Sequence, residues 1–383
     1  MKRFFVIILL CVVIGDVTAQ QKETDTTSLV DKAAGLAEYM LDLVTWEKER
    51  YIFSIYPMAG YSPRTGAEIG LMPVLRILPK KPSDSPYFRP TTIAPSFQVS
   101  TSGMYEMQFD VVAFSSRQFY VISRMQYLYL PDSFYGLGNG DKEPPYSDYE
   151  LNHFGFRGDF LKGWKDKYFI GVRADINYNE NNNVTGDLLH PGILGYAGGW
   201  ANGMGPVLTF DNRDDLLYPT RGWYMSTSTM WYTDKLGSDY DFNTLEFDVR
   251  HYLSLRADKS ILAFQGYMNF THGDVPFFKR AFLGGKRLLR GIPHPHKYLD
   301  QHAWYVQGEY RQHIWWRVGA TAFAGVGNVF GDLNNNMLND AHVAGGLGLR
   351  FRVLPDDGLN FRIDYGMTNR GDNALYFTIR EAF

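Results

Sequence analysis

The feature that most constrains the fold of this chain is an alternation of apolar and polar residues with a period of two. The clearest segment is 244–254, where Leu245, Phe247, Val249 and Leu253 alternate with Glu246, Asp248 and Arg250. Segments 105–111, 168–178 and 359–365 alternate in the same way. Successive side chains of a β-strand point to opposite faces, so this period predicts strands with one apolar and one polar face.

Two all-β architectures fit such strands. In a soluble sandwich the apolar face forms the core, whereas in a membrane barrel it contacts lipid and the charged face lines the lumen. A lumen position spares Lys or Arg the roughly 2–4 kcal/mol that either costs at the bilayer midplane. Aromatic residues make up 16% of the chain, charged residues only 21%, and there are 38 glycines, which favours a barrel with aromatic girdles.

The lengths of the connections support the barrel. Sixteen strands are expected near 51–57, 64–78, 91–102, 104–114, 119–130, 149–161, 167–179, 203–211, 221–233, 240–254, 260–272, 300–312, 316–329, 341–353, 359–368 and 374–383. Short turns at 115–118, 257–260 and 355–358 fall on one side, and long connections at 131–148, 180–202, 273–299 and 330–340 on the other. This asymmetry predicts a 16-stranded antiparallel transmembrane β-barrel in the outer membrane of a Gram-negative bacterium.

The N-terminal region predicts export. Lys2 and Arg3 precede an apolar run over 4–14 and a small-residue cleavage site at 17–19, so residues 1–19 are expected to be a cleaved signal peptide. Residues 20–50 then form a periplasmic segment with a short amphipathic helix over 29–44, and 51–383 form the barrel. The only cysteine, Cys11, lies in the signal peptide, which excludes disulfides and thiolate chemistry in the mature chain.

One segment, 277–292, interrupts the alternation. Its cations and glycines are too many for a membrane strand, although strand-like segments flank it on both sides. We expect this segment to be an extracellular loop that folds into the lumen with Arg290 as its anchor. A guanidinium stays charged, so where water is scarce it needs carboxylate or carbonyl partners.

Four segments together resemble the BamA/TamA outer-membrane assembly superfamily, whose barrel is called the bacterial surface antigen domain. They are the stretch 57–70, the sequence LPDSFYGLGN at 130–139, a turn within 208–226, and the loop described above. The turn carries Asp211, Arg213, Asp214, Pro219 and Gly222, which match the family's periplasmic turn motif. The loop carries Gly284, Gly285, Leu289, Arg290 and Gly291, which match its sixth extracellular loop.

The resemblance implies partners for the loop and a role for the last strand. The family pattern places a glutamate of the following strand against the loop arginine, which points to Glu309. Gly325 stands where relatives carry an aspartate, so either the anchoring is weaker or Asp364 compensates. The last strand would carry a C-terminal assembly signal with Phe377, Ile379 and Phe383.

In function, the resemblance implies a nonenzymatic barrel, bounded by outer-membrane lipids, that contributes to insertion or export of other outer-membrane proteins. A weak seam between the first and last strands would open sideways and template a client strand. Residues 20–50 are too few for the periplasmic POTRA-type modules of such proteins. The barrel would then use a separate periplasmic partner, serve a narrow client set, or have lost assembly activity.

The alternative from another class is a passive pore or structural barrel without assembly activity, because lumen charges could line a water path. The near-neutral net charge of −3 predicts no nucleic-acid partner. No cofactor or metal is expected. His294, His296 and His302 lack an acidic companion, and 332–340 lacks the terminal glutamate of a calcium loop.

Overall fold

The computed structural model describes residues 45–79, 90–114, 118–140, 142, 145–165, 167–215, 218–256, 259–333, 337–354, 359–379 and 381–383. Residues 47–383 form one compact unit. The expected signal peptide and the helix over 29–44 lie outside the described residues. The first described element is the short strand β1 (Thr45–Lys48).

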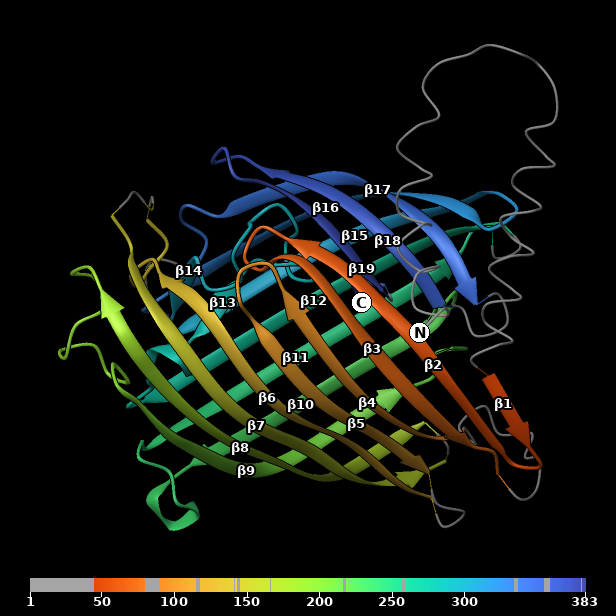
Figure 1. Cartoon of the computed structure of the whole chain (residues 1–383), viewed down its shortest axis with the longest axis horizontal. Helices are drawn as coiled ribbons and strands as arrows, with labels where there is room; N and C mark the ends of the chain where they lie inside the picture. The colour runs from red at the N-terminus through yellow and green to blue at the C-terminus, as the bar shows by residue number, and fades with distance from the viewer. Residues whose placement is uncertain are drawn as a thin grey trace, which may run out of the picture. The chain divides into compact units, whose positions relative to one another are not determined.

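Sixteen antiparallel strands form a closed barrel (Figure 1). They are β2 (Tyr51–Ser62), β3 (Gly66–Ile77), β4 (Thr91–Ser100), β5 (Tyr105–Phe114), β6 (Phe119–Phe134), β7 (Ser147–Trp164), β8 (Tyr168–Thr185), β9 (Gly198–Asp211), β10 (Gly222–Tyr232), β11 (Phe242–Ser254), β12 (Ser260–Gly273), β15 (His302–Trp315), β16 (Val318–Phe330), β17 (His342–Leu354), β18 (Leu359–Thr368) and β19 (Asn373–Ile379). Each strand pairs with the next, and β19 returns to β2. The barrel predicted from the sequence is therefore confirmed, including the number of its strands.

The two faces of the strands settle the choice between barrel and sandwich. On β11, Phe247 and Val249 are exposed on the outer surface, whereas Tyr252 is fully buried on the inner side. The same alternation places Arg173 and Asp175 of β8 inside, where both are buried. Apolar side chains therefore cover the outside of a closed sheet, as expected of a wall that contacts lipid.

Several strands extend beyond the predicted limits. Strands β6, β7, β8 and β9 continue further toward the long connections, which are correspondingly shorter than expected. The extensions of β6 and β8 carry Phe134 and Val184, which pack in one cluster with Phe277 and Leu299 of the loop region. Packing against the loop therefore holds these residues in strand conformation, a long-range effect that a local pattern does not encode.

The first and last barrel strands also differ from expectation. β2 continues through Pro57 to Ser62, and Pro57 stands in register with Leu71 of β3. β19 ends at Ile379 instead of residue 383, and Glu381, Ala382 and Phe383 leave the wall. Among the described residues no helix is long and apolar enough to cross a membrane.

Candidate functional site: the lumen loop and the seam

The segment between β12 and β15 folds as a compact unit. It contains a 3₁₀ turn (Phe277–Lys279) and a two-stranded sheet of β13 (Ala281–Leu283) and β14 (Tyr298–Asp300). Its apolar residues Leu283, Leu289 and Ile292 are almost fully buried, in a cluster with Tyr305 of β15 and Val329 of β16. The buried residues between β13 and β14 thus lie against the inner side of the barrel wall.

Glycines allow the loop backbone to approach the wall closely. Gly291 has φ +128°, a conformation that residues with a Cβ rarely adopt. A Cβ added at Gly291 would lie 3.0 Å from the Met367 nitrogen of β18. On the wall side, a Cβ at Gly366 would lie 2.6 Å from the Arg290 carbonyl oxygen. The loop at 290–291 therefore rests directly on the backbone of β18.

Arg290 is buried and contacts both carboxylates named as candidate partners. Its Nη1 donates to Asp364 Oδ2 at 2.7 Å, and its Nη2 donates to Glu309 Oε2. Its guanidinium also lies 3.7 Å from the centre of the Phe323 ring. The side chains of Arg290, Glu309 and Asp364 are at most 1% exposed. Burial at this depth is tolerable only because the charges are matched and hydrogen-bonded.

The same two carboxylates hold three further arginines, which the sequence patterns did not single out. Arg311 Nε lies 2.7 Å from Glu309 Oε1, Arg350 Nη1 lies 2.6 Å from Asp364 Oδ1, and Arg362 Nη1 lies 2.9 Å from Asp364 Oδ2. We call these six residues together with Glu381 the lumen charge cluster. Each arginine belongs to a different element, so the cluster joins the loop to β15, β17 and β18.

Gly325 of β16 has a steric explanation. A Cβ at this position would lie 2.9 Å from Leu289 Cδ1 and equally close to Gln307 Cβ. Leu289 of the loop therefore occupies the space that a side chain at position 325 would need. An aspartate is not simply missing here, because Leu289 packs in its place and Asp364 of β18 supplies the second carboxylate.

Residues 381–383 turn into the lumen instead of continuing the last strand. Glu381 accepts hydrogen bonds from Arg350 Nε at 2.9 Å and Asn360 Nδ2 at 2.7 Å. Arg311 Nη2 donates to the Phe383 backbone oxygen at 3.0 Å, and Phe383 packs against Tyr252. Of the three residues expected in a C-terminal assembly signal, Phe377 and Ile379 lie on β19, whereas Phe383 is buried inside.

The seam between the last and first strands is much shorter than any other strand pairing. Among the residues that the structure describes, Phe377 of β19 and Tyr61 of β2 are the only register pair between these strands, and their rings meet edge to face. By contrast, β18 pairs with β19 from Phe361–Ile379 to Met367–Asn373. The inward turn at residues 381–383 removes the segment that would otherwise continue this pairing along β2.

The hairpin between β2 and β3 is bound to β6 by a salt bridge that the sequence did not indicate. Arg64 donates to both carboxylate oxygens of Asp132 on β6, with Nε 3.0 Å from Oδ1, and the Asp132 side chain is 3% exposed. Tyr149 donates to the same carboxylate at 3.3 Å.

The positive charge of Arg64 also affects His296 in the lumen loop. Burial, and then the nearby positive charge of Arg64, lower the pKa of His296 to about 4.

The turn motif expected on the periplasmic side forms hydrogen bonds within itself. Arg213 donates to both carboxylate oxygens of Asp211, at 2.9 and 2.8 Å. Asp214 accepts from the Thr220 backbone nitrogen at 2.9 Å. Gly222 has φ +106°, and a Cβ there would lie 2.6 Å from the Asn212 carbonyl oxygen. These contacts explain the residue types of the motif as turn-forming, and Pro219 lies within the same turn.

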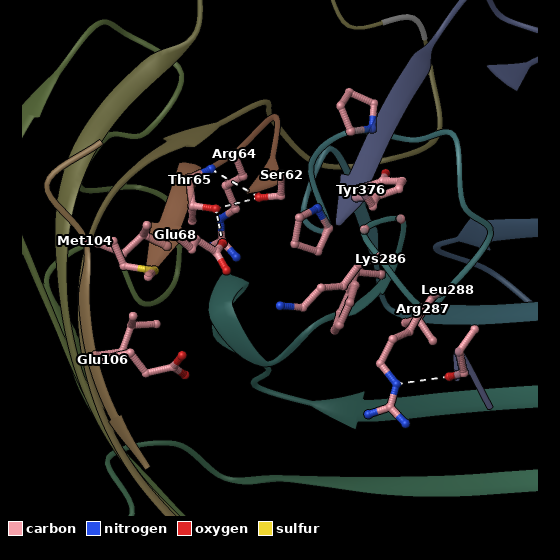
Figure 2. Close-up of a pocket in the computed structure, with 18 of the residues that line it drawn as sticks. Ser62, Arg64, Thr65, Glu68, Met104, Glu106, Lys286, Arg287, Leu288 and Tyr376 are labelled. Atoms are coloured by element: carbon pink, nitrogen blue, oxygen red, sulfur yellow. Dashed lines mark hydrogen bonds between the residues drawn. The ribbon is translucent and has the colours of Figure 1, made fainter. Parts of the chain in front are cut away.

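Two adjoining cavities lie between the loop tip and β2–β6. The larger, about 490 Å³, extends from the β2–β3 hairpin to the loop tip at Lys286 and Arg287 (Figure 2). The smaller, about 320 Å³, lies behind the seam and is lined by residues of β2 and β19, including Gly60 and Phe377. The histidines considered as metal ligands are not gathered into a site, and the described residues contain no cluster of three or more such side chains.

Comparison with known proteins gives a family for this architecture. Residues 96–383 match the profile of the Omp85 superfamily domain. The structure resembles BamA from Haemophilus ducreyi lacking POTRA domains 1–3 (TM-score 0.58, 13% identity, covering 94% of this chain and 80% of that one). It also resembles CdiB from Acinetobacter baumannii, with a TM-score of 0.52 and 11% identity, covering 87% of this chain and 60% of that one. CdiB from Escherichia coli gives a TM-score of 0.55 and 10% identity, covering 88% of this chain and 63% of that one. No curated protein sequence matches the chain.

Proposed function

The chain belongs to the Omp85 superfamily of outer-membrane assembly and translocation barrels, and from this premise we propose that it contributes to the insertion or export of other proteins. In this proposal the seam between β2 and β19 opens sideways, and the freed strand edge pairs with a strand of the client. The protein acts without catalytic residues. A separate periplasmic partner delivers the client to the barrel.

The observation that carries the proposal is that, in the described part of the seam, a single register pair, Tyr61 with Phe377, joins β19 to β2. Within a bilayer every backbone N–H and C=O needs a partner, and each unsatisfied group costs several kcal/mol. A strand edge with little pairing is therefore a template for another strand. An incoming strand would gain the hydrogen bonds that this seam does not make.

Two further features support an opening at this place. The cavity of about 320 Å³ lies directly behind the seam, so separation of β2 from β19 would connect it with the surface of the barrel. The inward residues 381–383 are held by Arg311, Arg350 and Asn360, which keeps them away from β2. The unequal strength of the pairings makes the seam the place where the wall separates at least cost.

A disulfide across the seam tests the proposal. Tyr61→Cys with Phe377→Cys joins two register partners, and directly opposite residues of antiparallel strands are the positions at which a cross-strand disulfide can form. Tyr365→Cys with Leu375→Cys joins β18 to β19 and serves as the matched control, because those strands are paired along their length. Both double variants would be expressed as the sole copy and compared in oxidised and reduced cells.

We expect the seam disulfide, and not the control disulfide, to lower the amounts of other barrel proteins in the outer membrane, with recovery on reduction. Normal amounts of other barrels with the seam locked would contradict the proposal. Impaired solute uptake under that condition would instead identify the passive pore.

A further inference from the structure

The apolar side chains on the outside of the wall leave a hollow of about 540 Å³ over β8, β9, β10 and β11. Its lining includes Ile170, Leu208 and Phe247, which belong to the exposed apolar surface of the barrel. It lies where these strands adjoin the turns of the side expected to face the periplasm. The hollow therefore opens on lipid and not on the lumen.

The register of the strands explains why the wall is hollow at this place. Leu208 of β9, Thr227 of β10 and Phe247 of β11 stand opposite one another in one row across the sheet. Residues opposite one another on antiparallel strands share a face, so all three point outward. Thr227 is the shortest of the three, and the long side chains on either side of it rise above it. One short residue thus leaves a groove between two long ones.

An aromatic row borders the hollow next to the turns. Trp164, Tyr168 and Phe210 come from β7, β8 and β9, and their ring centres are 5.7 Å apart for the first pair and 5.1 Å for the second. Trp and Tyr gather at the level of lipid headgroups, because their rings contact acyl chains while their polar atoms reach water. The row therefore marks the headgroup level, and Ile170 and Leu208, paired one step further along β8 and β9, lie on its acyl-chain side.

Lysines stand beside this aromatic row. The segment 162–167, which joins β7 to β8, holds three lysines and one aspartate and so carries a net positive charge. Lys165 and Lys167 are exposed, and Lys165 Nζ lies 4.5 Å from the centre of the Trp164 ring. Basic residues next to a membrane surface attract anionic lipids. The hollow is thus bordered by cations at the depth of the phosphate groups.

The carboxylates of the adjacent turn, between β9 and β10, are held within that turn. Arg213 donates to both oxygens of Asp211 at 2.9 and 2.8 Å. Asp214 accepts hydrogen bonds from the backbone nitrogen and the hydroxyl of Thr220, at 2.9 and 2.5 Å. An anion that approaches the hollow from the membrane surface therefore meets the lysines of the β7–β8 turn.

We propose that the hollow binds an anionic phospholipid of the leaflet that faces the periplasm. One acyl chain lies in the row of Leu208, Thr227 and Phe247, where it covers the short residue. The phosphate contacts Lys165 and Lys167 through charge-assisted hydrogen bonds, which are stronger than neutral ones. The ammonium group of a zwitterionic headgroup is repelled by the same lysines, so a headgroup with a net negative charge binds better.

The site lies opposite the seam in the closed wall. Eight wall strands, β2 to β9, separate the β9–β10 pair from the seam in one direction, and eight, β10 to β12 and β15 to β19, separate it in the other. A lipid bound at the hollow does not touch β2 or β19. The inference therefore does not depend on whether the seam admits client proteins.

The test uses the full chain in nanodiscs of mixed phosphatidylethanolamine and phosphatidylglycerol. Two photoreactive lipids with identical acyl chains are added in trace amounts, one with each headgroup. After illumination, mass spectrometry of peptides shows which strands are labelled and with what yield. We expect labelling of the wild type to concentrate on β8 to β11. The phosphatidylglycerol probe should label these strands at least about fivefold more than the other probe, as the attraction of one lysine to an anionic lipid predicts.

Filling the hollow tests the position of the acyl chain. Thr227→Leu places a longer side chain in the groove, and labelling of β8 to β11 should fall at least about fivefold, as lost contact with about one or two CH₂ groups predicts. Thr229→Leu is the matched control, because Thr229 is on the same strand and does not line the hollow. Its labelling should equal that of the wild type.

Removing the cations tests the position of the phosphate. In the double variant Lys165→Gln with Lys167→Gln, the two probes should label β8 to β11 equally. The control is Lys48→Gln with Lys235→Gln, which removes the same charge at exposed positions that do not line the hollow. This control should keep the preference for phosphatidylglycerol.

Heat-modifiable mobility on gels verifies that each variant is folded, and the wild type decides the main question even where a variant is not. Labelling of the wild type spread evenly around the wall would show ordinary lipid contact only and would overturn the inference. Equal labelling of the wild type by the two probes would overturn it as well. So would unchanged labelling of folded Thr227→Leu, or a preference for phosphatidylglycerol that persists without Lys165 and Lys167.

Discussion

Arg290 links the loop to two strands of the barrel wall through one side chain. It is the only arginine of the loop segment 277–292 whose guanidinium lies within the lumen charge cluster described here, and it donates to carboxylates from two different strands. The carboxylates it contacts are shared with Arg311, Arg350 and Arg362. The loop is thus fastened by a network and not by an isolated pair, and the cost of losing one member depends on how well the others compensate.

Arg290→Ala should lower the amount of folded barrel in outer membranes. Removing one member of a buried ion pair costs about 3–5 kcal/mol, and the remaining arginines make this an upper limit. The measurement is the fraction of heat-modifiable protein in isolated outer membranes. Arg221→Ala is the control, because the Arg221 side chain is 73% exposed. Wild-type amounts of folded Arg290→Ala barrel would show that the loop does not need this anchor.

His296 predicts a pH dependence in the weakly acidic range. Its pKa is lowered from 6.5 to about 4 by burial and by Arg64, with Asp132 opposing and His294 and His153 adding to the effect. Between these values the unfolded chain binds a proton that the folded loop does not, so stability falls as pH decreases from about 6.5 to 4 and changes no further below that.

The decrease in the free energy of unfolding over this pH range should be on the order of 1–3 kcal/mol for the wild type and should be smaller in His296→Gln. Urea unfolding of purified barrel at pH 7 and pH 5 measures it. Other groups titrate in this range as well, so the decisive quantity is the difference between the two proteins. An identical pH response of wild type and variant would exclude His296 as its source.

At the scale of elements, the first hairpin is held near its turn by two contacts of different kinds. Toward β19 it has a single register pair, whereas at its turn Arg64 is bound to Asp132 on β6. The hairpin is therefore bound more firmly to β6 than to β19. This arrangement lets the seam be weak without leaving β2 and β3 free to move.

Arg64→Ala should loosen this hairpin selectively. Loss of the buried bridge leaves Asp132 without its cation, so amide exchange in residues 51–77 should become faster, while exchange in β15 to β17 should not change. Hydrogen exchange followed by mass spectrometry measures both regions. Arg124→Ala, which removes a salt bridge between the neighbouring strands β5 and β6, is the control. Equal acceleration in both variants would mean that the Arg64 bridge has no special role.

At the scale of the whole molecule, the wall and the loop have different origins of stability. The wall is built from pairings of strands adjacent in sequence, except for its closure by residues 61 and 377. The loop is held by residues contributed from β15, β16, β17 and β18 and by the inward residues 381–383. Substitutions at the seam or in the cavities can therefore leave the lumen charge cluster, which holds the loop, intact.

The alternation of apolar and polar residues determined the number of strands, their order and the direction of each face, because strand geometry imposes a period of two wherever one face meets an apolar surroundings. The loop motif likewise drew attention to Arg290, because a buried guanidinium requires carboxylates, and its resemblance to a known family pointed to Glu309 and Asp364. These are local requirements, and a sequence displays them directly.

Tertiary structure alone decided the rest. The extensions of β6 and β8 follow from packing against the loop, the end of β19 from the bonds of Glu381 to Arg350 and Asn360, and the residue at 325 from the position of Leu289. The bridge between Arg64 and Asp132 joins segments distant in the chain. No local pattern encodes such meetings, because they depend on how the closed wall brings its inner side chains and the loop into the same space.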